Sequence, residues 1–114
     1  MSSLPFDPSG VFIAGVWRPC ASGETLPLFN PSDGSLLAQI ARGATADIDA
    51  AVAAAQAALD GQWGRLSAAE RGRVLLRMSA AVLAQADELA WLEALDVGKP
   101  LKQGRADAQA LARY

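Results

Sequence analysis

Residues 36–60, LLAQIARGATADIDAAVAAAQAALD, contain the change of pattern that decides the fold. The segment Leu36–Ile40 is short, apolar and bounded by turn residues, as is typical of a β-strand. After Gly43 the apolar residues instead recur at the spacing of one helical face, at Ile48, Val52, Ala55 and Leu59. This stretch therefore predicts a strand that is followed directly by an amphipathic helix.

The ends of this first helix are also marked in the sequence. Thr45 is suited to be its N-cap, and Asp47 lies in the first turn, where the helix dipole favours a carboxylate. Asp60-Gly61 is expected to end the helix, because glycine commonly follows the last helical residue.

Upstream of this stretch, two β-hairpins are predicted within residues 11–41. In the first, apolar residues 11–13 and 16–17 flank Ala14-Gly15, a two-residue loop that suits a tight turn. In the second, residues 26–29 and 36–40 flank Asn30-Pro31-Ser32-Asp33-Gly34, where proline and glycine favour a turn. Residues 1–10 are expected to be flexible.

Downstream, three more helical segments are predicted, so that helices occupy residues 45–114. Ser67-Ala68-Ala69-Glu70 matches a capping box and should begin the second helix, whose apolar residues cover more than one stripe. A third helix is expected from about Asp87 to Leu95, before Gly98-Lys99-Pro100. The last segment, residues 101–114, is compatible with a helix. The isolated chain is therefore predicted to be α+β, with hairpins followed by three to four helices.

The composition excludes several classes of protein. Apolar residues make up 52% and charged residues 19% of the 114 residues, which is typical of a globular chain. The net charge is −2, and the basic residues are interleaved with acidic ones, so no nucleic-acid partner is expected. No apolar run is long enough to cross a membrane, and the N-terminus does not resemble a secretory signal, which makes a cytoplasmic location the expectation.

The chain also lacks the residue types that much of enzyme chemistry needs. It contains no histidine and one cysteine, which excludes an internal disulfide, a Ser-His-Asp triad and a Cys-His pair within these residues. The helices follow one another without intervening strands, whereas a parallel sheet needs strands that alternate with helices. We therefore expect residues 1–114 to be a partial domain whose helices cover strands beyond residue 114.

The order of short motifs resembles the N-terminal segment of the NAD(P)-dependent aldehyde dehydrogenase superfamily, over essentially the whole chain after residue 10. The motifs are Phe12-Ile13-Ala14-Gly15-Val16-Trp17, Phe29-Asn30-Pro31-Ser32-Asp33-Gly34, Asp47-Ile48-Asp49-Ala50-Ala51-Val52, Trp63, Glu70-Arg71-Gly72-Arg73-Val74-Leu75, Asp87-Glu88-Leu89-Ala90, residues 92–100 (LEALDVGKP) and Ala112-Arg113-Tyr114.

This resemblance implies the fold and activity of a larger, oligomeric protein. It implies that the chain is the N-terminal part of an α/β, Rossmann-like cofactor-binding domain, in an oxidoreductase that uses NAD or NADP to oxidise an aldehyde to a carboxylic acid. In the family the catalytic cysteine, the glutamate and the cofactor-binding segment come later, so no catalytic or cofactor-binding residue is expected here. The chain alone is expected to be inactive and to hold no NAD(P). Neither the aldehyde nor the choice between NAD and NADP is indicated.

The resemblance also implies a monovalent cation site for K⁺ or Na⁺. By this match the ligands would be the Asp96 carboxylate and the backbone carbonyls of Leu28 and Phe29, since hard cations prefer oxygen ligands. The alternative is that Asp96 only helps to end its helix or pairs with a lysine.

Other residues that invite a functional interpretation have simpler explanations. Cys20 lies in a loop-like segment without a neighbouring base, and Gly98-Lys99-Pro100 is expected to be a structural corner rather than a phosphate site. Glu93 has no partner acid at a useful sequence spacing. Trp17 and Trp63 are predicted to be core anchors, and Trp91 is left open.

Two kinds of partner are compatible with the exposed helix faces expected here. The first is the rest of an aldehyde dehydrogenase chain or a family member, for which this chain would be a truncated or gene fragment. The second is self-association, or packing on a full-length relative, as a non-catalytic interaction module. A lone cation-binding domain is a third hypothesis and depends on Asp96 alone.

Overall fold

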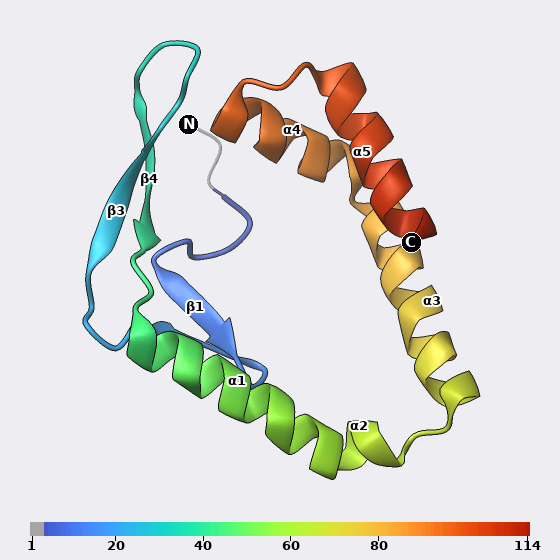
Figure 1. The fold of residues 1–114 in the computed structure, drawn as a ribbon. Helices are drawn as coiled ribbons and strands as arrows, with labels where there is room; N and C mark the ends of the chain where they lie inside the picture. Colours follow the sequence, from blue (N-terminus) through green and yellow to red (C-terminus); the bar gives the residue numbers. More distant parts are fainter. Residues whose placement is uncertain (1–3) are drawn as a thin grey trace. The chain divides into compact units, whose positions relative to one another are not determined.

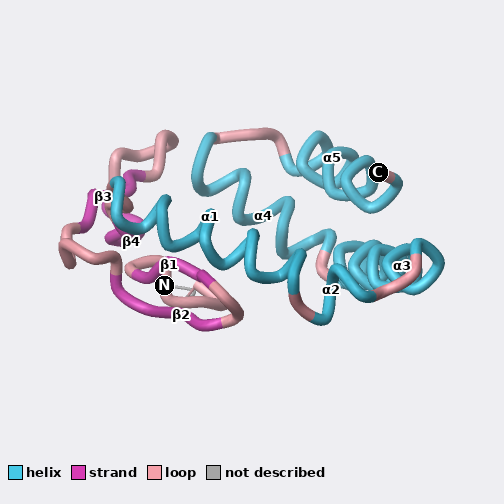
Figure 2. Tube along the Cα trace, turned by 60° about the horizontal axis from the view of Figure 1, so that its bottom comes forward, coloured by secondary structure: helices cyan, strands magenta, loops and turns pink. Residues whose placement is uncertain are grey.

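A computed structural model describes residues 4–114, which form two small hairpins followed by helices (Figures 1 and 2). This α+β order confirms the predicted fold class. The described chain divides into two compact units. The first unit holds the residues up to Leu28 together with Leu36–Arg65, and the second holds Phe29–Ser35 together with Leu66–Tyr114.

The first hairpin pairs β1 (Gly10–Ile13) with β2 (Val16–Pro19) in antiparallel register. Ile13 lies opposite Val16, so the loop is the predicted pair Ala14-Gly15. Both loop residues have positive φ, 53° and 79°, which is the geometry of the tight turn that matches strand twist. The predicted hairpin is confirmed, one residue longer at its start and two residues longer at its end.

The second hairpin joins β3 (Thr25–Phe29) to β4 (Leu36–Ala41), as predicted. The Asn30 side-chain oxygen accepts a hydrogen bond from the backbone N–H of Ser32 at 2.9 Å, and Gly34 takes a φ of 73°. The turn chemistry expected of Asn30-Pro31 is therefore present.

In the first unit, α1 (Thr45–Asp60) is followed by the short α2 (Gln62–Arg65). The prediction that Thr45 caps α1 is wrong, because Ala44 holds the N-cap position without a side-chain bond. Asp47 does this work instead: its carboxylate accepts from the N–H groups of Ala44, at 3.0 Å, and of Ala21, at 2.9 Å. A carboxylate in the first turn can reach back to the orphaned N–H at the cap. Asp47 thereby joins the loop after β2 to the start of α1.

The second unit contains α3 (Ala68–Ala84), α4 (Ala86–Val97) and α5 (Leu101–Arg113). The predicted capping box is confirmed, since Ser67 Oγ accepts from the Glu70 N–H at 3.2 Å and Glu70 Oε2 accepts from the Ser67 N–H at 2.8 Å. Gly98 ends α4 with a left-handed φ of 69°, and Pro100 stands at the start of α5. The structural corner predicted at this step is therefore confirmed.

Packing inside the second unit depends on small residues where α4 meets α5. Ala90 is 1% exposed, and Gly104 and Ala108 are also buried. A Cβ atom placed on Gly104 would lie 2.9 Å from Ala90 Cα, so only glycine permits this approach. The Ser79 hydroxyl donates to the Ala112 carbonyl at 2.6 Å and connects α3 to α5.

The large apolar residues are packed less completely than the small ones. Among residues 4–114, no large side chain is fully buried, and the buried apolar residues are Cys20, Ala90 and Ala108. The prediction that Trp17 is a core anchor is wrong, because its side chain is 52% exposed and stacks on Phe6 with ring centroids 6.1 Å apart. Trp63 and Trp91 are half-buried. Phe6 and Phe12 lie beside the Trp17 ring, and about half of the side chain remains exposed.

The expectation of flexibility at residues 1–10 falls partly outside the described residues, which begin at Leu4. Within the described part, the Pro8 carbonyl accepts from the Ala41 N–H at 2.9 Å, and the Asp7 carboxylate accepts from Ser9. None of the helices found in residues 4–114 combines the length and apolar character needed to cross a bilayer.

Candidate functional site

Three charged side chains meet where α4 turns into α5. Lys99 Nζ lies 2.7 Å from Glu93 Oε2 and 2.7 Å from Asp107 Oδ2. Gln103 donates from Nε2 to Asp107 Oδ1 at 2.8 Å. Gln103 and Asp107 are four residues apart on α5, so they share one side of that helix. Lys99 reaches Asp107 from the corner that precedes the helix. One ammonium group is therefore held between carboxylates from two helices.

These contacts change the proton affinities of the cluster. Asp107, and after it Glu93, raises the pKa of Lys99 above its usual value. Lys99, and after it Gln103, lowers the pKa of Asp107. The lysine is therefore protonated near neutral pH, when it can act neither as a nucleophile nor as a base. Glu93 was expected to lack an acidic partner, whereas the tertiary structure brings Asp107 to the same lysine.

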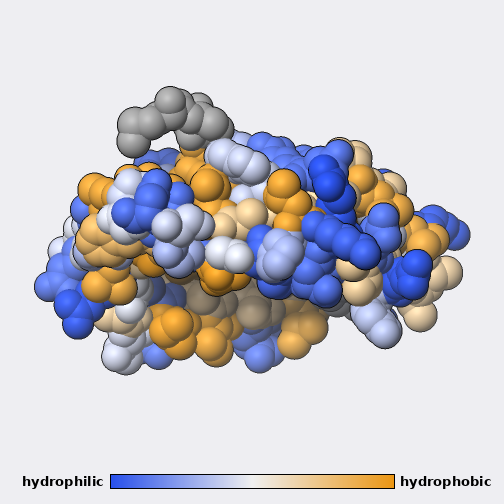
Figure 3. Space-filling view, turned by 90° about the horizontal axis from the view of Figure 1, so that it is seen from above, coloured by the Kyte–Doolittle hydropathy of each residue, from blue (hydrophilic) through white to orange (hydrophobic). Residues whose placement is uncertain are grey.

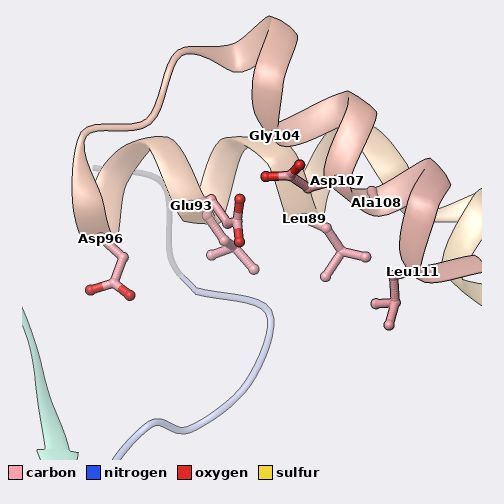
Figure 4. Close-up of a pocket in the computed structure, with 8 residues that line it drawn as sticks. Leu89, Glu93, Asp96, Gly104, Asp107, Ala108 and Leu111 are labelled. Carbon is pink, nitrogen blue, oxygen red and sulfur yellow. The ribbon is translucent and has the colours of Figure 1, made fainter.

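A pocket of about 310 Å³ borders this cluster in the second unit (Figure 4). Its apolar lining comes from Leu89, Leu92, Ala108 and Leu111, and its carboxylates are Glu93, Asp96 and Asp107. Figure 4 shows Leu89, Glu93 and Asp96 along one side of α4. The pocket combines an apolar wall with oxygen atoms, and within it Glu93 and Asp107 are already paired with Lys99.

The three residues predicted to hold a monovalent cation are found on different elements. Leu28 and Phe29 lie on β3, and Asp96 is an exposed residue in the last turn of α4. Leu28 belongs to the first unit, whereas Phe29 and Asp96 belong to the second. Among the described residues, no three His, Cys, Asp or Glu side chains are grouped as metal ligands. The cation site stays a prediction that rests on family resemblance.

The Cys20 thiol is buried and hydrogen-bonded to the backbone. It is 4% exposed, and its Sγ donates to the Glu24 carbonyl at 3.1 Å. A buried thiol that is held by a backbone carbonyl is poorly placed to attack a substrate. The geometry agrees with the simpler interpretation of this residue.

The exposed faces of α1 and α3 are apolar. On α1, Ile48, Val52 and Leu59 expose 62%, 63% and 57% of their surface, although they share one helical face. On α3, the exposed apolar residues include Leu75, Leu76 and Met78. Figure 3 shows hydrophobic residues reaching the surface among hydrophilic ones. Such faces are typical of surfaces that another protein segment covers.

Three structural features were not predicted from the sequence. The pairing of Lys99 with Glu93 and Asp107 depends on how α4 and α5 meet, although the spacing of Gln103 and Asp107 on α5 was a usable signal for their hydrogen bond. The close approach at Gly104 and the double role of Asp47 had no signal of their own, because each depends on residues distant in the chain.

Comparison with known proteins places this arrangement in a family. The profile described as the aldehyde dehydrogenase family matches residues 17–114. The chain is 43% identical over 89 residues to the 2-hydroxymuconic semialdehyde dehydrogenase of Pseudomonas sp. (strain CF600), covering 78% of this chain and 18% of that protein.

Solved structures agree. A protein from Burkholderia cenocepacia assigned to the aldehyde dehydrogenases is 61% identical, with a TM-score of 0.87, over 90% of this chain and 22% of its own. A mutant indole-3-acetaldehyde dehydrogenase of P. syringae, solved with NAD⁺ and IAA, is 39% identical with a TM-score of 0.84. The match covers 92% of this chain and 22% of that protein. The fold matches the N-terminal part of such structures, and the chain spans about a fifth of their length.

Proposed function

The chain belongs to the aldehyde dehydrogenase family, and from this premise we propose that it supplies the N-terminal part of an NAD(P)-dependent aldehyde dehydrogenase without catalysing the reaction itself. In the intact protein the activity would be oxidation of an aldehyde to a carboxylic acid, with NAD or NADP as the electron acceptor. The role of this part would be to cover and support the cofactor-binding domain.

The observation that carries this proposal is the exposure of the apolar faces of α1 and α3. An amphipathic helix is normally stabilised by burial of its apolar face, yet Val52 and Leu76 expose 63% and 72% of their surface. Each buried leucine or valine contributes about 1.5–3 kcal/mol relative to its exposed state. Covering both faces with the remainder of a dehydrogenase would therefore be strongly favourable.

The residues of this chain support a structural role. The carboxylates of Glu93 and Asp107 are paired with Lys99, and the Cys20 thiol is buried. None of these groups is placed as an activated thiolate that could attack the carbonyl carbon of an aldehyde. We expect the purified 114-residue chain to produce no NADH from propanal or betaine aldehyde and to bind neither NAD nor NADP in a calorimeter. NADH production above a protein-free blank would contradict this role.

A complementation experiment tests the supporting role directly. The Burkholderia cenocepacia relative, with its own matching segment deleted, would be expressed with and without the present chain. We expect the deleted relative to be inactive or aggregated, and its aldehyde oxidation to return when this chain is present.

The matched controls are Val52→Asp and Ala53→Asp. Val52→Asp places a charge within the exposed apolar face of α1 that Ile48, Val52 and Leu59 form. Ala53→Asp places the same charge at an exposed alanine on another side of that helix. Restoration should be lost with Val52→Asp and kept with Ala53→Asp. Equal restoration by both variants would contradict docking through this face.

The second candidate function is a non-catalytic interaction module that binds itself or a full-length relative. It is favoured by the same bare faces, because they would also serve as a protein-binding surface. A chain that fails to restore the deleted relative, yet binds the complete one, would support the module instead.

A further inference from the structure

A groove of the second unit lies between α3 and the C-terminal end of α5, with a volume of about 670 Å³. Apolar side chains form most of its lining, including Leu75, Leu76, Met78 and Leu111. The hydrogen bond from Ser79 to the Ala112 carbonyl holds the two helices together beside it. The groove is thus an apolar trough between connected helices, of the kind that can receive an amphipathic helix.

The side-chain charges that line this groove are of one sign. Arg73 and Arg113 are its charged lining residues, and both are exposed. No acidic residue is among the described residues that line it. Glu70, the acidic residue of α3, is engaged by Ser67 at the N-terminus of the helix. An occupant with an apolar face and flanking carboxylates would therefore match the groove in both respects.

The α1 helix has these two properties. Ile48, Val52 and Leu59 form its exposed apolar stripe. Asp49 and Asp60 lie about 100° and about 120° around the helix from Ile48, on the same side of the stripe. The segment Thr45–Asp60 contains no lysine or arginine. The stripe is therefore bordered by carboxylates with no basic residue to offset them.

The stripe is also exposed for a structural reason within its own unit. α1 contacts β1, and its half-buried residues include the alanines Ala50, Ala51 and Ala54. These small residues occupy another side of the helix from the large ones, because 3.6 residues make one turn. Within the first unit, α1 therefore packs through its alanines, and its larger apolar residues stay exposed.

We propose that the chain associates with a second copy of itself by placing α1 of one copy in the α3–α5 groove of the other. The contact joins two different surfaces of the chain. Two copies that each place α1 in the groove of the other close a twofold dimer, whereas contacts that are not reciprocated form a ring or an open series. The proposal deepens the proposed function, since both treat the bare helix faces as docking surfaces. It names the partner that fits them when no remainder of a dehydrogenase is present.

The test begins with the mass of the full 114-residue chain in solution. Sedimentation velocity would be measured from about 1 µM to about 1 mM, a range that brackets weak to moderate affinities. We expect the mass to rise above 11.8 kDa with concentration. Because the rim charges are exposed, added salt should weaken the association without abolishing it. A monomer throughout this range would overturn the proposal.

A matched pair of variants locates the contact. Leu76→Glu puts a carboxylate into the groove and should weaken association at least about tenfold. Phe12→Ser removes a similarly exposed apolar side chain from the first hairpin and should leave association unchanged. Circular dichroism of each variant monitors folding. Association that survives Leu76→Glu, or that is lost equally with Phe12→Ser, would overturn the proposed contact.

A charge exchange provides the sharpest test. Arg73→Glu with Arg113→Glu should weaken association, and so should Asp49→Arg with Asp60→Arg. Because the contact joins unlike surfaces, mixing these two variants should restore binding between them. Failure to restore it, with both variants folded, would remove the charge complementarity on which the pairing depends.

The outcomes for the two proposals are distinguishable. A monomeric chain that still restores the deleted relative would keep the proposed function and eliminate self-association. A chain that self-associates but does not restore the activity of the deleted relative would keep self-association and eliminate the proposed function.

Discussion

The contact between α4 and α5 and the outward faces of α1 and α3 differ in the residues that they use. Where α4 meets α5, the buried residues are Ala90, Gly104 and Ala108, and salt bridges through Lys99 border the contact. The outward faces carry Val52 and Leu76, which are large and exposed. The chain therefore completes its own packing where small residues let backbones approach. Its larger apolar residues stay exposed on faces that no other part of the described chain covers.

The largest expected effect comes from filling the α4–α5 contact. Gly104→Val places side-chain atoms where a Cβ atom already lies 2.9 Å from Ala90 Cα, so α4 and α5 must separate. Overpacking of this kind costs about 1–3 kcal/mol, and we expect the upper part of that range. Urea denaturation followed by circular dichroism measures it. Gly72→Ala is the control, because nothing lies within 4 Å of its added Cβ, and alanine should stabilise α3 by up to about 1 kcal/mol. Equal effects of both changes would refute the close-packing argument.

The next effect concerns Asp47, which connects the loop after β2 to α1. The N–H of Ala44, and after it that of Ala21, lowers the pKa of Asp47. A lowered folded pKa stabilises the protein above the unfolded value of about 3.9, and this contribution is lost as pH falls through the folded pKa.

Replacement of Asp47 should therefore remove part of the acid sensitivity of the first unit. Asp47→Asn is expected to lower the Tm by several degrees at pH 7 and by less as the pH falls below about 4. Asp49→Asn, which removes a charge but no hydrogen bond seen among the described residues, is the control. A Tm loss that is the same at every pH would contradict the ionic role of Asp47.

A smaller effect is expected at the corner between α4 and α5. Gly98 has a φ of 69°, and an added Cβ atom would lie 3.3 Å from Pro31 Cγ. A non-glycine residue in this conformation costs about 1–2 kcal/mol, so Gly98→Ala should lower the free energy of unfolding by about that amount. Gly98→Asn should cost less, because asparagine tolerates left-handed backbone angles. Thermal unfolding would rank the two variants, and the opposite order would rule out this explanation.

The smallest effect is expected on the bare face of α1. Ile48→Thr removes an apolar group that is already 62% exposed, so the free energy of unfolding should change by no more than about 0.5 kcal/mol. Denaturation at the lowest usable concentration measures the single chain. A loss as large as that of Gly104→Val at this concentration would mean that the face is covered in solution.

Much of the fold was predictable because it is encoded locally. The Ala14-Gly15 loop, the Asn30 turn and the Ser67-Glu70 capping box each involve residues close in sequence, and each was found as predicted. The errors concern residues whose environment depends on distant parts of the chain. Thr45 was favoured as a cap from residue preference, whereas Asp47 reaches both Ala44 and Ala21. Trp17 is predicted as a core anchor from the wide spacing of the tryptophans, but burial would need another segment to cover its ring, and the residue is 52% exposed.

The candidate site was less predictable than the fold for the same reason. The Lys99 cluster forms between helices whose crossing is set by Ala90 and Gly104, and no pattern in the sequence states that crossing. The sequence by itself determined most of the elements and the family, because turns, caps and periodic apolar residues act over a few positions. Only the tertiary structure decided which carboxylates share a lysine and which apolar faces stay bare, because both depend on packing between segments far apart in the chain.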